Sequence, residues 1–470
     1  MKNRNHRRKA GAVWAVLLLY AAALFTAPVR SVTASVEPSG AAERIALTVI
    51  SNNPSFDCRK VLDDNEKTRL YSPEKNVFSI TAEQPFSHLY LKFEKETDWV
   101  LTLPDGTKLD GGEENYIHRY LPLGQEVTSC KLTLPPYGAL TDVYAFTDGT
   151  PPDWVQLWEP PCERADLMVM PTHADDEFLW FGGAIPYYAG ELGYEVQVVY
   201  LTNHNNATVR NHERLNGLWK TGVRHYPVVS DFLDDRRSKK NVVSASDLLG
   251  YNKVMTYQVM LLRRFRPRVV LAQDIRGEYG HGAHILNAKT VLRALELTDD
   301  PAQFPDSAEK YGTCRIEKCY LHLWKEKPIT VNWSDKKLSR FGGKSALDMA
   351  IEGFECHKSQ VIAMKVLESG PYDCRQFGLA YTTVGDDTPN TNDFFEHIDM
   401  SDKLPAEEAA ISSAPVEEPV TPSDVPDDRK AEKTPFRAGW FLAAVFAVLA
   451  ILAVLGVFAL TAVGRKRPER

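Results

Sequence analysis

The sequence predicts an α/β protein in which an all-β sandwich precedes a domain built on a mostly parallel sheet with helices on both faces. Three observations predict this. Residues 36–160 alternate polar and apolar side chains, residues 162–400 contain short apolar runs separated by helical patterns, and prolines mark the boundary between the two regions. A chain of 470 residues is also too long for one ordinary domain.

The composition is that of a globular protein, with 44% hydrophobic and 25% charged residues and a net charge of -7. Basic residues cluster only at the termini, so we expect no nucleic-acid partner. The seven cysteines are irregularly spaced and form no CxxC pair, so we assign neither a disulfide nor a zinc ribbon.

The first residues have the three-part layout of a secretory signal. A basic stretch at residues 2–9 precedes an apolar run at residues 10–27, and small residues follow at Ala34 and Ser35. We therefore interpret residues 1–34 as a signal peptide. Because the apolar run is long for such a peptide, an uncleaved signal anchor is the alternative.

Residues 36–160 are predicted to form a β-sandwich, because short strands with regular turns are typical of sandwiches and jelly rolls. The alternating segments are residues 88–93, 99–103, 130–134 and 142–146. The arrangement resembles the galactose-binding-like modules that accompany many carbohydrate-active enzymes. Trp99, Tyr116 and Tyr120 are candidates for stacking on sugars, although core packing is the more frequent role of aromatic residues in such strands.

The apolar runs of residues 162–400 are of the kind buried on both faces of a parallel sheet. They are residues 165–170, 196–201 and 269–272, with a further strand at residues 319–324. Helical patterns are present at residues 213–221, 254–265 and 345–366. Strands that alternate with helices indicate a mostly parallel, doubly wound sheet.

Beyond this domain the composition changes twice. Residues 401–437 are rich in Pro, Glu, Asp, Ala and Ser, which predicts a disordered linker. Residues 438–463 carry no charge and are long enough to cross a bilayer as one helix. By the positive-inside rule, residues 464–470 form a basic cytoplasmic tail. We therefore expect a single-pass protein of the cell membrane with an extracellular catalytic domain; a buried soluble helix is the alternative.

Functional side chains follow two of the predicted strands. His173, Asp175 and Asp176 come after the first strand, where open parallel sheets place their functional crevice. His281 and His284 would share one face of a helix turn after the strand that ends near Asp274. Two histidines and a carboxylate from two strand ends form the ligand set of a catalytic zinc. Such a metal acidifies a bound water, and a neighbouring carboxylate can take the proton.

These residues also resemble the motifs of a known family. The stretch from His173 to Glu177 resembles the motif AHPDDE, and the stretch from His281 to His284 resembles HPDH. Further matches are Arg210-Asn-His-Glu213, Gly222-Val223, His357-Lys-Ser-Gln360, Val384-Gly-Asp-Asp387 and Asn392-Asp-Phe-Phe-Glu396. Residues 165 to about 398 are thus similar to the PIG-L (LmbE-like) zinc-dependent N-acetylglucosaminyl deacetylases, which implies a Rossmann-like α/β fold.

The resemblance implies a role for each site residue. The ligands of Zn2+, or of another divalent metal such as iron, would be His173, Asp176 and His284. The resemblance makes Asp175 the general base, and His281 the general acid or the stabiliser of the tetrahedral intermediate. It also implies that Tyr279 donates to the oxyanion and that Arg210 binds substrate. Glu177 is either a helix-capping or supporting residue or a direct participant.

Two positions depart from the family motifs. Ala174 stands where the first motif has proline, and Ala283 stands where the second has an acid that can tune the neighbouring histidine. We expect the first change to alter loop rigidity and the second to alter the protonation of His281.

The resulting hypothesis is a cell-surface hydrolase that removes the N-acetyl group from an N-acetylglucosamine-type sugar or glycan. One alternative is an amidase that acts on another N-acyl substrate. The other is a non-catalytic, carbohydrate-binding surface protein, against which the complete set of ligands and base argues.

Overall fold

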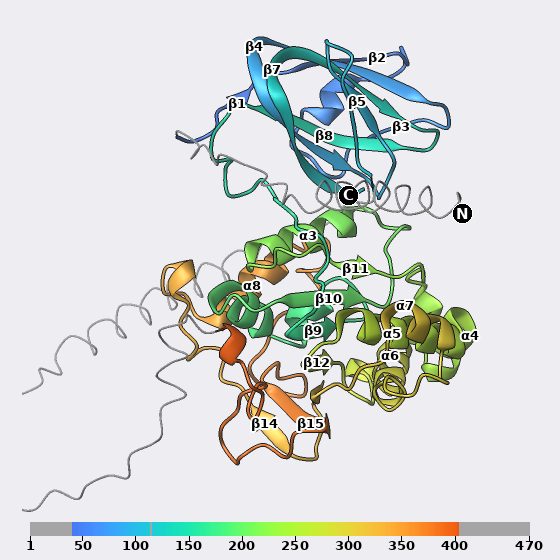
Figure 1. Cartoon of the computed structure of the whole chain (residues 1–470), viewed down its shortest axis with the longest axis vertical. Helices are drawn as coiled ribbons and strands as arrows, with labels where there is room; N and C mark the ends of the chain where they lie inside the picture. Colours follow the sequence, from blue (N-terminus) through green and yellow to red (C-terminus); the bar gives the residue numbers. More distant parts are fainter. Residues whose placement is uncertain (1–39, 113–114, 404–470) are drawn as a thin grey trace, which may run out of the picture. The chain divides into compact units, whose positions relative to one another are not determined.

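The computed structural model describes residues 40–112 and 115–403 (Figure 1). The expected signal peptide, the membrane helix at residues 438–463, the basic tail and most of the expected linker lie outside these residues. Within the part of the chain that is described, no helix has the length and apolar character needed to span a bilayer.

Residues 44–146 form the all-β part of the molecule, in a single hydrogen-bonded sheet. Its strands are β1 (Arg44–Ile45), β2 (Thr48–Ser51), β3 (Leu70–Tyr71), β4 (Asn76–Phe93), β5 (Val100–Thr102), β6 (Lys108–Asp110), β7 (His118–Leu134) and β8 (Ala139–Phe146), with the 3-10 helix η1 (Cys58–Val61) between β2 and β3. The path through the sheet is β1-β8-β4-β7-β5-β6, with β2 paired to β4 and β3 to β8.

The two long strands, β4 and β7, connect the halves of this sheet. The first half of β4 pairs with β2 and the second half with β8, while β7 runs antiparallel to both halves. Register shifts between Thr81 and His88 interrupt the ladder, and such irregularities bend a strand. The all-β prediction is confirmed, and the hydrogen bonds join all the strands into one sheet.

The three aromatic residues considered for sugar stacking take part in packing. Trp99 and Tyr116 are buried, and Tyr120 is partly buried against Phe146. Tyr116 stacks on Tyr226 of the α/β part, with ring centroids 4.1 Å apart. Of the two interpretations, core packing therefore describes their place in the structure.

The α/β part contains a second sheet of seven strands in the order β11-β10-β9-β12-β13-β15-β14. These strands are β9 (Leu167–Met170), β10 (Val196–Tyr200), β11 (Val228–Val229), β12 (Val269–Ala272), β13 (Lys318–His322), β14 (Pro328–Thr330) and β15 (Gln376–Thr382). From β11 to β13 the pairs are parallel, and β14 and β15 are antiparallel additions. The parallel strands thus follow the doubly wound order, with the direction of winding reversed between β9 and β12.

Helices cover both faces of this sheet (Figure 1). They are α2 (Asp176–Leu179), the π-helix η2 (Pro186–Glu191), α3 (Val209–Lys220), η3 (Arg236–Lys239), α4 (Val242–Leu249), α5 (Tyr251–Phe265), η4 (Glu278–Gly280), α6 (Gly282–Leu295), α7 (Pro305–Tyr311), η5 (Ser339–Phe341), α8 (Ala346–Glu355) and η6 (Ser401–Lys403). Strand β9 shows how the faces divide. Leu167 and Val169 pack with α2, α3 and α8, whereas Met168 and Met170 pack with α5 and α6. Successive residues of the strand therefore pack into the hydrophobic cores on opposite faces of the sheet.

Three boundaries differ from the sequence prediction. The helix expected at residues 345–366 begins after a capping box at Ser345 but ends at Glu355, and turns take the place of its expected second half. His281 is not inside a helix but is the N-cap of α6. Ser401, expected at the start of the linker, begins the 3-10 helix η6, in which Lys403 pairs with Asp166.

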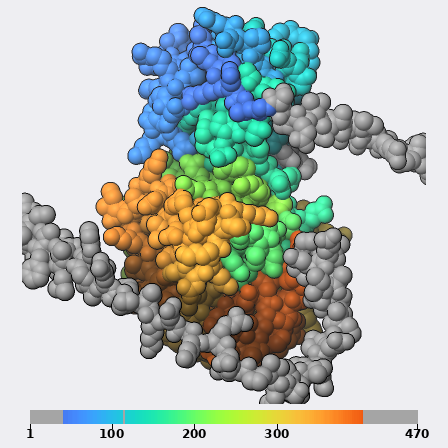
Figure 2. Space-filling model, turned by 90° about the vertical axis from the view of Figure 1, so that its left-hand side faces the viewer, coloured from blue at the N-terminus to red at the C-terminus, as the bar shows by residue number. Residues whose placement is uncertain are grey.

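The all-β part packs along helix α3, where atoms of the blue-to-cyan segments meet green ones in Figure 2. Glu94 accepts a hydrogen bond from Thr208 at the start of the helix (2.9 Å), and the rings of His118 and His212 are hydrogen-bonded at 2.7 Å. Near its end, Asn216 donates to Glu66 (2.9 Å). Residues four apart share one face of a helix, so the all-β part holds α3 along one side.

Candidate active site

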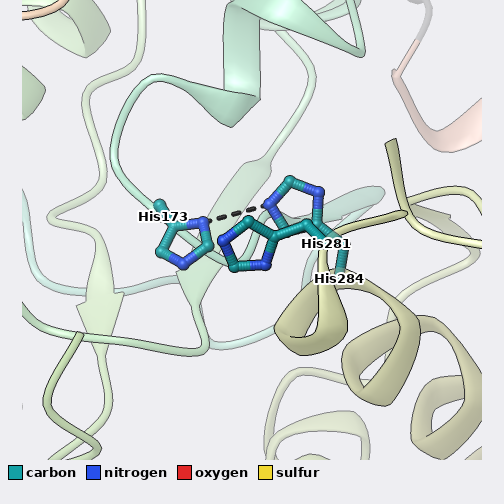
Figure 3. A group of neighbouring side chains, drawn as sticks. All are labelled: His173, His281 and His284. Carbon is teal, nitrogen blue, oxygen red and sulfur yellow. Dashed lines mark hydrogen bonds between the residues drawn. The ribbon is translucent and has the colours of Figure 1, made fainter. Parts of the chain in front are cut away.

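The predicted site residues meet where the winding of the sheet reverses. His173 lies just beyond β9, and His281 and His284 lie beyond its neighbour β12, at the start of α6. Their three rings converge (Figure 3). Neighbouring parallel strands end at the same edge of the sheet, which is why two segments more than 100 residues apart build one site.

Three ligand atoms form a triangle whose size suits a metal ion. His173 Nδ1 lies 3.1 Å from His284 Nε2 and 3.2 Å from Asp176 Oδ2, and His284 Nε2 lies 3.3 Å from Asp176 Oδ2. Ligands at about 2.0–2.1 Å from a tetrahedral zinc lie about 3.3 Å from one another. The three predicted ligands therefore fit a divalent metal.

His281 belongs to a wider group. One nitrogen from each of His173, His281 and His284 lies within 4.8 Å of the other two. We favour Asp176 over His281 as the third ligand, because its Oδ2 lies 3.2 and 3.3 Å from the other two donors, as tetrahedral geometry requires, and its charge offsets that of a cation.

Buried polar groups fix the orientation of these ligands. Glu278, which is fully buried, accepts from Nδ1 of His284 (2.8 Å) and from Nδ1 of His322 (2.8 Å). A carboxylate behind a histidine sets its tautomer and directs the other ring nitrogen to the metal. Asp176 is held by Trp180, whose indole N–H donates to Oδ1 (2.7 Å), and by Gln273, whose amide donates to Oδ2 (3.1 Å).

Charge compensation differs among the ligands. Burial disfavours charge on both His284 and Asp176, but their mutual attraction outweighs it. The pKa of His284 is raised to about 10, with help from Glu278, and the pKa of Asp176 is held well below its usual value. Asp176 is therefore already anionic, as a metal ligand needs to be, whereas a metal would have to displace a proton from His284.

Asp175 is held in a rare backbone conformation, with φ of 110°. Its N–H donates to Glu177 Oε2 (2.7 Å), and Glu177 Oε1 accepts from His357 Nε2 (3.0 Å). Glu177 is fully buried and does not line the cavity, so the structure places it behind Asp175 as a support. Positive φ in a residue other than glycine persists only where such surroundings enforce it.

The side chain of Asp175 faces a cation. Arg210 lies 3.2 Å from Asp175 Oδ2, donates to the carbonyl oxygen of Ala174, and approaches Asp234 at 3.7 Å. Burial raises the pKa of Asp175 well above the ordinary value, although Arg210 acts in the opposite direction. A carboxylate with a raised pKa is a better proton acceptor in catalysis.

His281 has a hydrogen bond that defines its tautomer. Its Nδ1 accepts from the N–H of Ala283 at 3.3 Å, which leaves Nε2 to carry the proton of a neutral ring. Burial, together with the nearby His173 and His284, lowers the pKa of His281 to about 2. His281 is therefore placed as a neutral hydrogen-bond donor rather than as a cationic acid.

Tyr279 lies at the edge of the site and is 42% exposed. Its ring centroid is 5.7 Å from that of His284, and Lys239 Nζ lies 5.1 Å from its ring centroid. Burial and the neighbouring carboxylates raise the pKa of Tyr279 far above its usual range, so its hydroxyl stays protonated and can donate a hydrogen bond.

A cavity of about 550 Å³ opens onto these groups. Its wall includes every predicted site residue except His284, which lies beneath it: His173, Asp175, Asp176, Arg210, Tyr279 and His281. A larger cavity of about 880 Å³, bordered by Glu96 and Tyr226, lies elsewhere and contains none of them. The smaller cavity is the candidate active site because it combines ligands, base and donors.

Both departures from the family motifs have structural partners. The N–H of Ala174, which a proline would lack, donates to His204 Nε2 at 3.1 Å. Burial lowers the pKa of His204 to about 3, so this ring is neutral and able to accept. Ala283 is buried in a small apolar core with Leu249 and Leu286.

Sequence reasoning missed several members of the site. Asp234 follows β11, a strand too short to recognise in the sequence. Its carboxylate oxygens lie 3.4 Å from His204 Nδ1 and 3.6 Å from His173 Nε2. His322 ends β13, so the rule that functional side chains lie at the carboxyl ends of strands is the signal that could have found it. Glu278 lies within the segment of the two histidines, but its burial is a tertiary property.

No family model matches the chain. It is 24% identical over 220 residues to 1D-myo-inositol 2-acetamido-2-deoxy-alpha-D-glucopyranoside deacetylase 1 of Catenulispora acidiphila, which covers 42% of this chain and 66% of that protein. It is 25% identical over 174 residues to 1D-myo-inositol 2-acetamido-2-deoxy-alpha-D-glucopyranoside deacetylase of Streptomyces scabiei, covering 32% of this chain and 54% of the relative.

Among solved structures, N,N'-diacetylchitobiose deacetylase from Pyrococcus horikoshii aligns with a TM-score of 0.33 and 19% identity, over 43% of this chain and 72% of that one. The chain thus spans 66% of the first of these curated relatives and 54% of the second. The sequence likeness supports the resemblance to deacetylases of acetamido sugars.

Proposed function

We propose that this protein is a metal-dependent hydrolase that removes the acetyl group from an N-acetylated amino sugar, with zinc as the first candidate metal. The observation that carries the proposal is the triangle of His173, Asp176 and His284 donors beside the buried carboxyl group of Asp175. The names of the curated relatives, which are deacetylases of an acetamido sugar, support the same reaction.

His173, Asp176 and His284 would hold the metal. A divalent metal in this position polarises a carbonyl group and makes a coordinated water more acidic. Asp175 would take a proton from the water, because a carboxylate with a raised pKa is a stronger base than an ordinary carboxylate. Hydrolysis consumes one water, breaks the amide C–N bond and releases acetate and an amine.

The remaining groups act on the acetyl carbonyl and on Asp175. The Nε2–H of His281 and the hydroxyl of Tyr279 are donors for the carbonyl oxygen as negative charge develops there. Arg210 holds the Asp175 carboxylate in place and offers its remaining N–H groups to the sugar.

The test measures metal content and acetate release from a panel of N-acetylhexosamine oligomers. Asn tolerates positive φ, so Asp175→Asn removes the base without changing the backbone. We expect kcat to fall about 100-fold to 10,000-fold with the metal content unchanged. Glu309→Gln is the control, because Glu309 is exposed on α7 and does not line the cavity.

Two outcomes would redirect the proposal. If the protein with intact His173 and His284 binds no divalent metal, the central claim fails. Bound metal without acetate release from any glycan would favour an amidase with a different N-acyl substrate.

We further propose that the enzyme acts outside the cell, anchored through residues 438–463, on polymeric or surface glycans. This proposal rests on the sequence of segments outside the described residues. Labelling of intact cells with a membrane-impermeant reagent, before and after protease treatment, checks it.

A further inference from the structure

A short basic helix borders the candidate active site. In η3 (Arg236–Lys239), two side chains, Arg236 and Lys239, line the cavity. In a 3-10 helix, residues three apart lie directly above one another, so these two cations share one face. Arg237 belongs to another face and pairs with Asp235, which caps the helix (2.6 Å).

The two cations of this face lack an anionic partner. Within the described part of the chain, no carboxylate lies within 4 Å of Arg236 or Lys239. The ammonium group of Lys239 lies over the Tyr279 ring, with Nζ 5.1 Å from the ring centroid. The acids that line the cavity have partners of their own: Asp175 and Asp234 face Arg210, and Asp176 faces the metal-binding histidines. Arg236 and Lys239 are therefore the two cations of the cavity lining that have no carboxylate partner among the described residues.

This basic face is fixed relative to the metal-binding residues. Gly282 separates His281 from Ala283, and a Cβ there would lie 2.1 Å from the carbonyl oxygen of Asn241 and 2.5 Å from that of Ser238. The end of η3 therefore rests on the backbone of the first turn of α6. The backbone that carries Arg236 and Lys239 is therefore held close to the candidate active site.

We propose that Arg236 and Lys239 form an anion subsite, which binds a carboxylate or phosphate group of the substrate beside the acetylated sugar. Guanidinium and ammonium groups recognise both oxyanions through charge-assisted hydrogen bonds. The proposal rests on the proposed function for the identity of the sugar, and it narrows the substrate to acidic glycoconjugates.

The test compares three substrates and one ligand. The substrates are neutral N,N'-diacetylchitobiose, N-acetylglucosamine 1-phosphate and the disaccharide of glucuronic acid and N-acetylglucosamine. We expect kcat/KM to be higher for one or both acidic compounds, and the one preferred identifies the phosphate or the carboxylate. In the double variant Arg236→Gln/Lys239→Gln this preference falls about 10-fold to 100-fold, mainly through KM. For the neutral substrate, the double variant keeps the kcat/KM of wild type. The control variant Arg237→Gln keeps the wild-type kcat/KM for all three substrates.

A binding measurement separates this proposal from the proposed function. Glucose 1-phosphate carries the anion but no acetamido group, so calorimetry reports on the subsite alone. Binding to wild type but not to the double variant, with no acetate release from any sugar, would uphold the subsite and overturn the deacetylase. Acetate release without preference for acidic substrates, unchanged in the double variant, would overturn the subsite and leave the deacetylase standing.

Discussion

At the scale of single residues, the site depends on buried carboxylates that touch histidines. Glu278 illustrates this, because it has no exposure and joins two rings that come from different elements, α6 and β13. The candidate metal ligand His284 owes the direction of its Nε2 to this contact. The affinity for a metal would therefore depend on Glu278, which contacts a candidate ligand but is not itself a candidate ligand.

Replacing Glu278 by glutamine tests that dependence. Each oxygen of the Glu278 carboxylate accepts from one histidine. The glutamine amide has only one oxygen, so one of the two N–H groups loses its acceptor. We expect metal affinity to fall about 10-fold to 100-fold, measured by competition with a chelator. Glu309→Gln, at an exposed position of α7, is the control. An unchanged affinity in a folded variant would contradict the role of Glu278.

The pKa of His284 predicts how metal binding depends on pH. In the metal-free protein this pKa is about 10, above the ordinary value of 6.5. The metal-free ring is thus protonated on both nitrogens at neutral pH, and a metal must displace the proton on Nε2. We expect the affinity to rise about tenfold per pH unit below pH 10 while one proton is released. Titrations at about pH 6, 7 and 8 measure the slope, and a flat profile would show that His284 is not a ligand.

At the scale of elements, close helix contacts position the base and the arginine. Gly217 of α3 meets α8 and α2, because a Cβ there would lie 2.8 Å from the carbonyl oxygen of Gly353 and 2.9 Å from the Phe178 ring. Helix α3 carries Arg210 in its first turn, and α2 begins next to Asp175. The spacing of these helices thus sets the distance between Arg210 and Asp175.

Gly217→Ala tests this packing, and the expected sign is opposite to that of helix propensity. Alanine stabilises an exposed helix by about 1 kcal/mol relative to glycine. Here we expect a loss of about 1–3 kcal/mol in the free energy of unfolding, because the methyl group forces the helices apart. Denaturant unfolding measures it, with Lys289→Ala at an exposed position of α6 as the control. A stabilised Gly217→Ala variant would mean that the helices can separate without cost.

At the scale of the whole molecule, the all-β part and the α/β part are joined by buried polar contacts. Glu66 of the all-β part pairs with Lys92 at 2.6 Å and accepts from Asn216 of α3 at 2.9 Å. Burial acts against its charge, but Lys92 and the neighbouring histidines outweigh it and lower the pKa of Glu66 to about 2. The interface therefore requires the ionised carboxylate.

We expect the stability of this interface to decrease at acidic pH. The pKa of Glu66 is depressed from 4.5, so its contribution is present above pH 4.5 and is lost as pH falls toward 2. The full effect is on the order of 2–3 kcal/mol. We expect the unfolding free energy of wild type to fall more steeply over this range than that of Glu66→Gln. Parallel slopes would show that Glu66 is not coupled to folding.

The sequence by itself determined the chemistry of the site. His173, Asp175 and Asp176 follow one apolar run, and His281 and His284 follow another, so residue type and strand ends alone predict a metal site with a base. Sequence patterns also predict the two kinds of sheet, since a period of two and continuous apolar runs record how strand faces are buried.

Only the tertiary structure decided the surroundings of that site. Glu278 and His322 meet because β12 and β13 pair in one register, and Asp234 arrives from a strand of two residues that has no sequence signature. Likewise, Tyr116 and Glu66 meet the α/β part through contacts between segments about 100 or more residues apart. Local patterns encode which face is buried, whereas partners across the core depend on how distant elements pack.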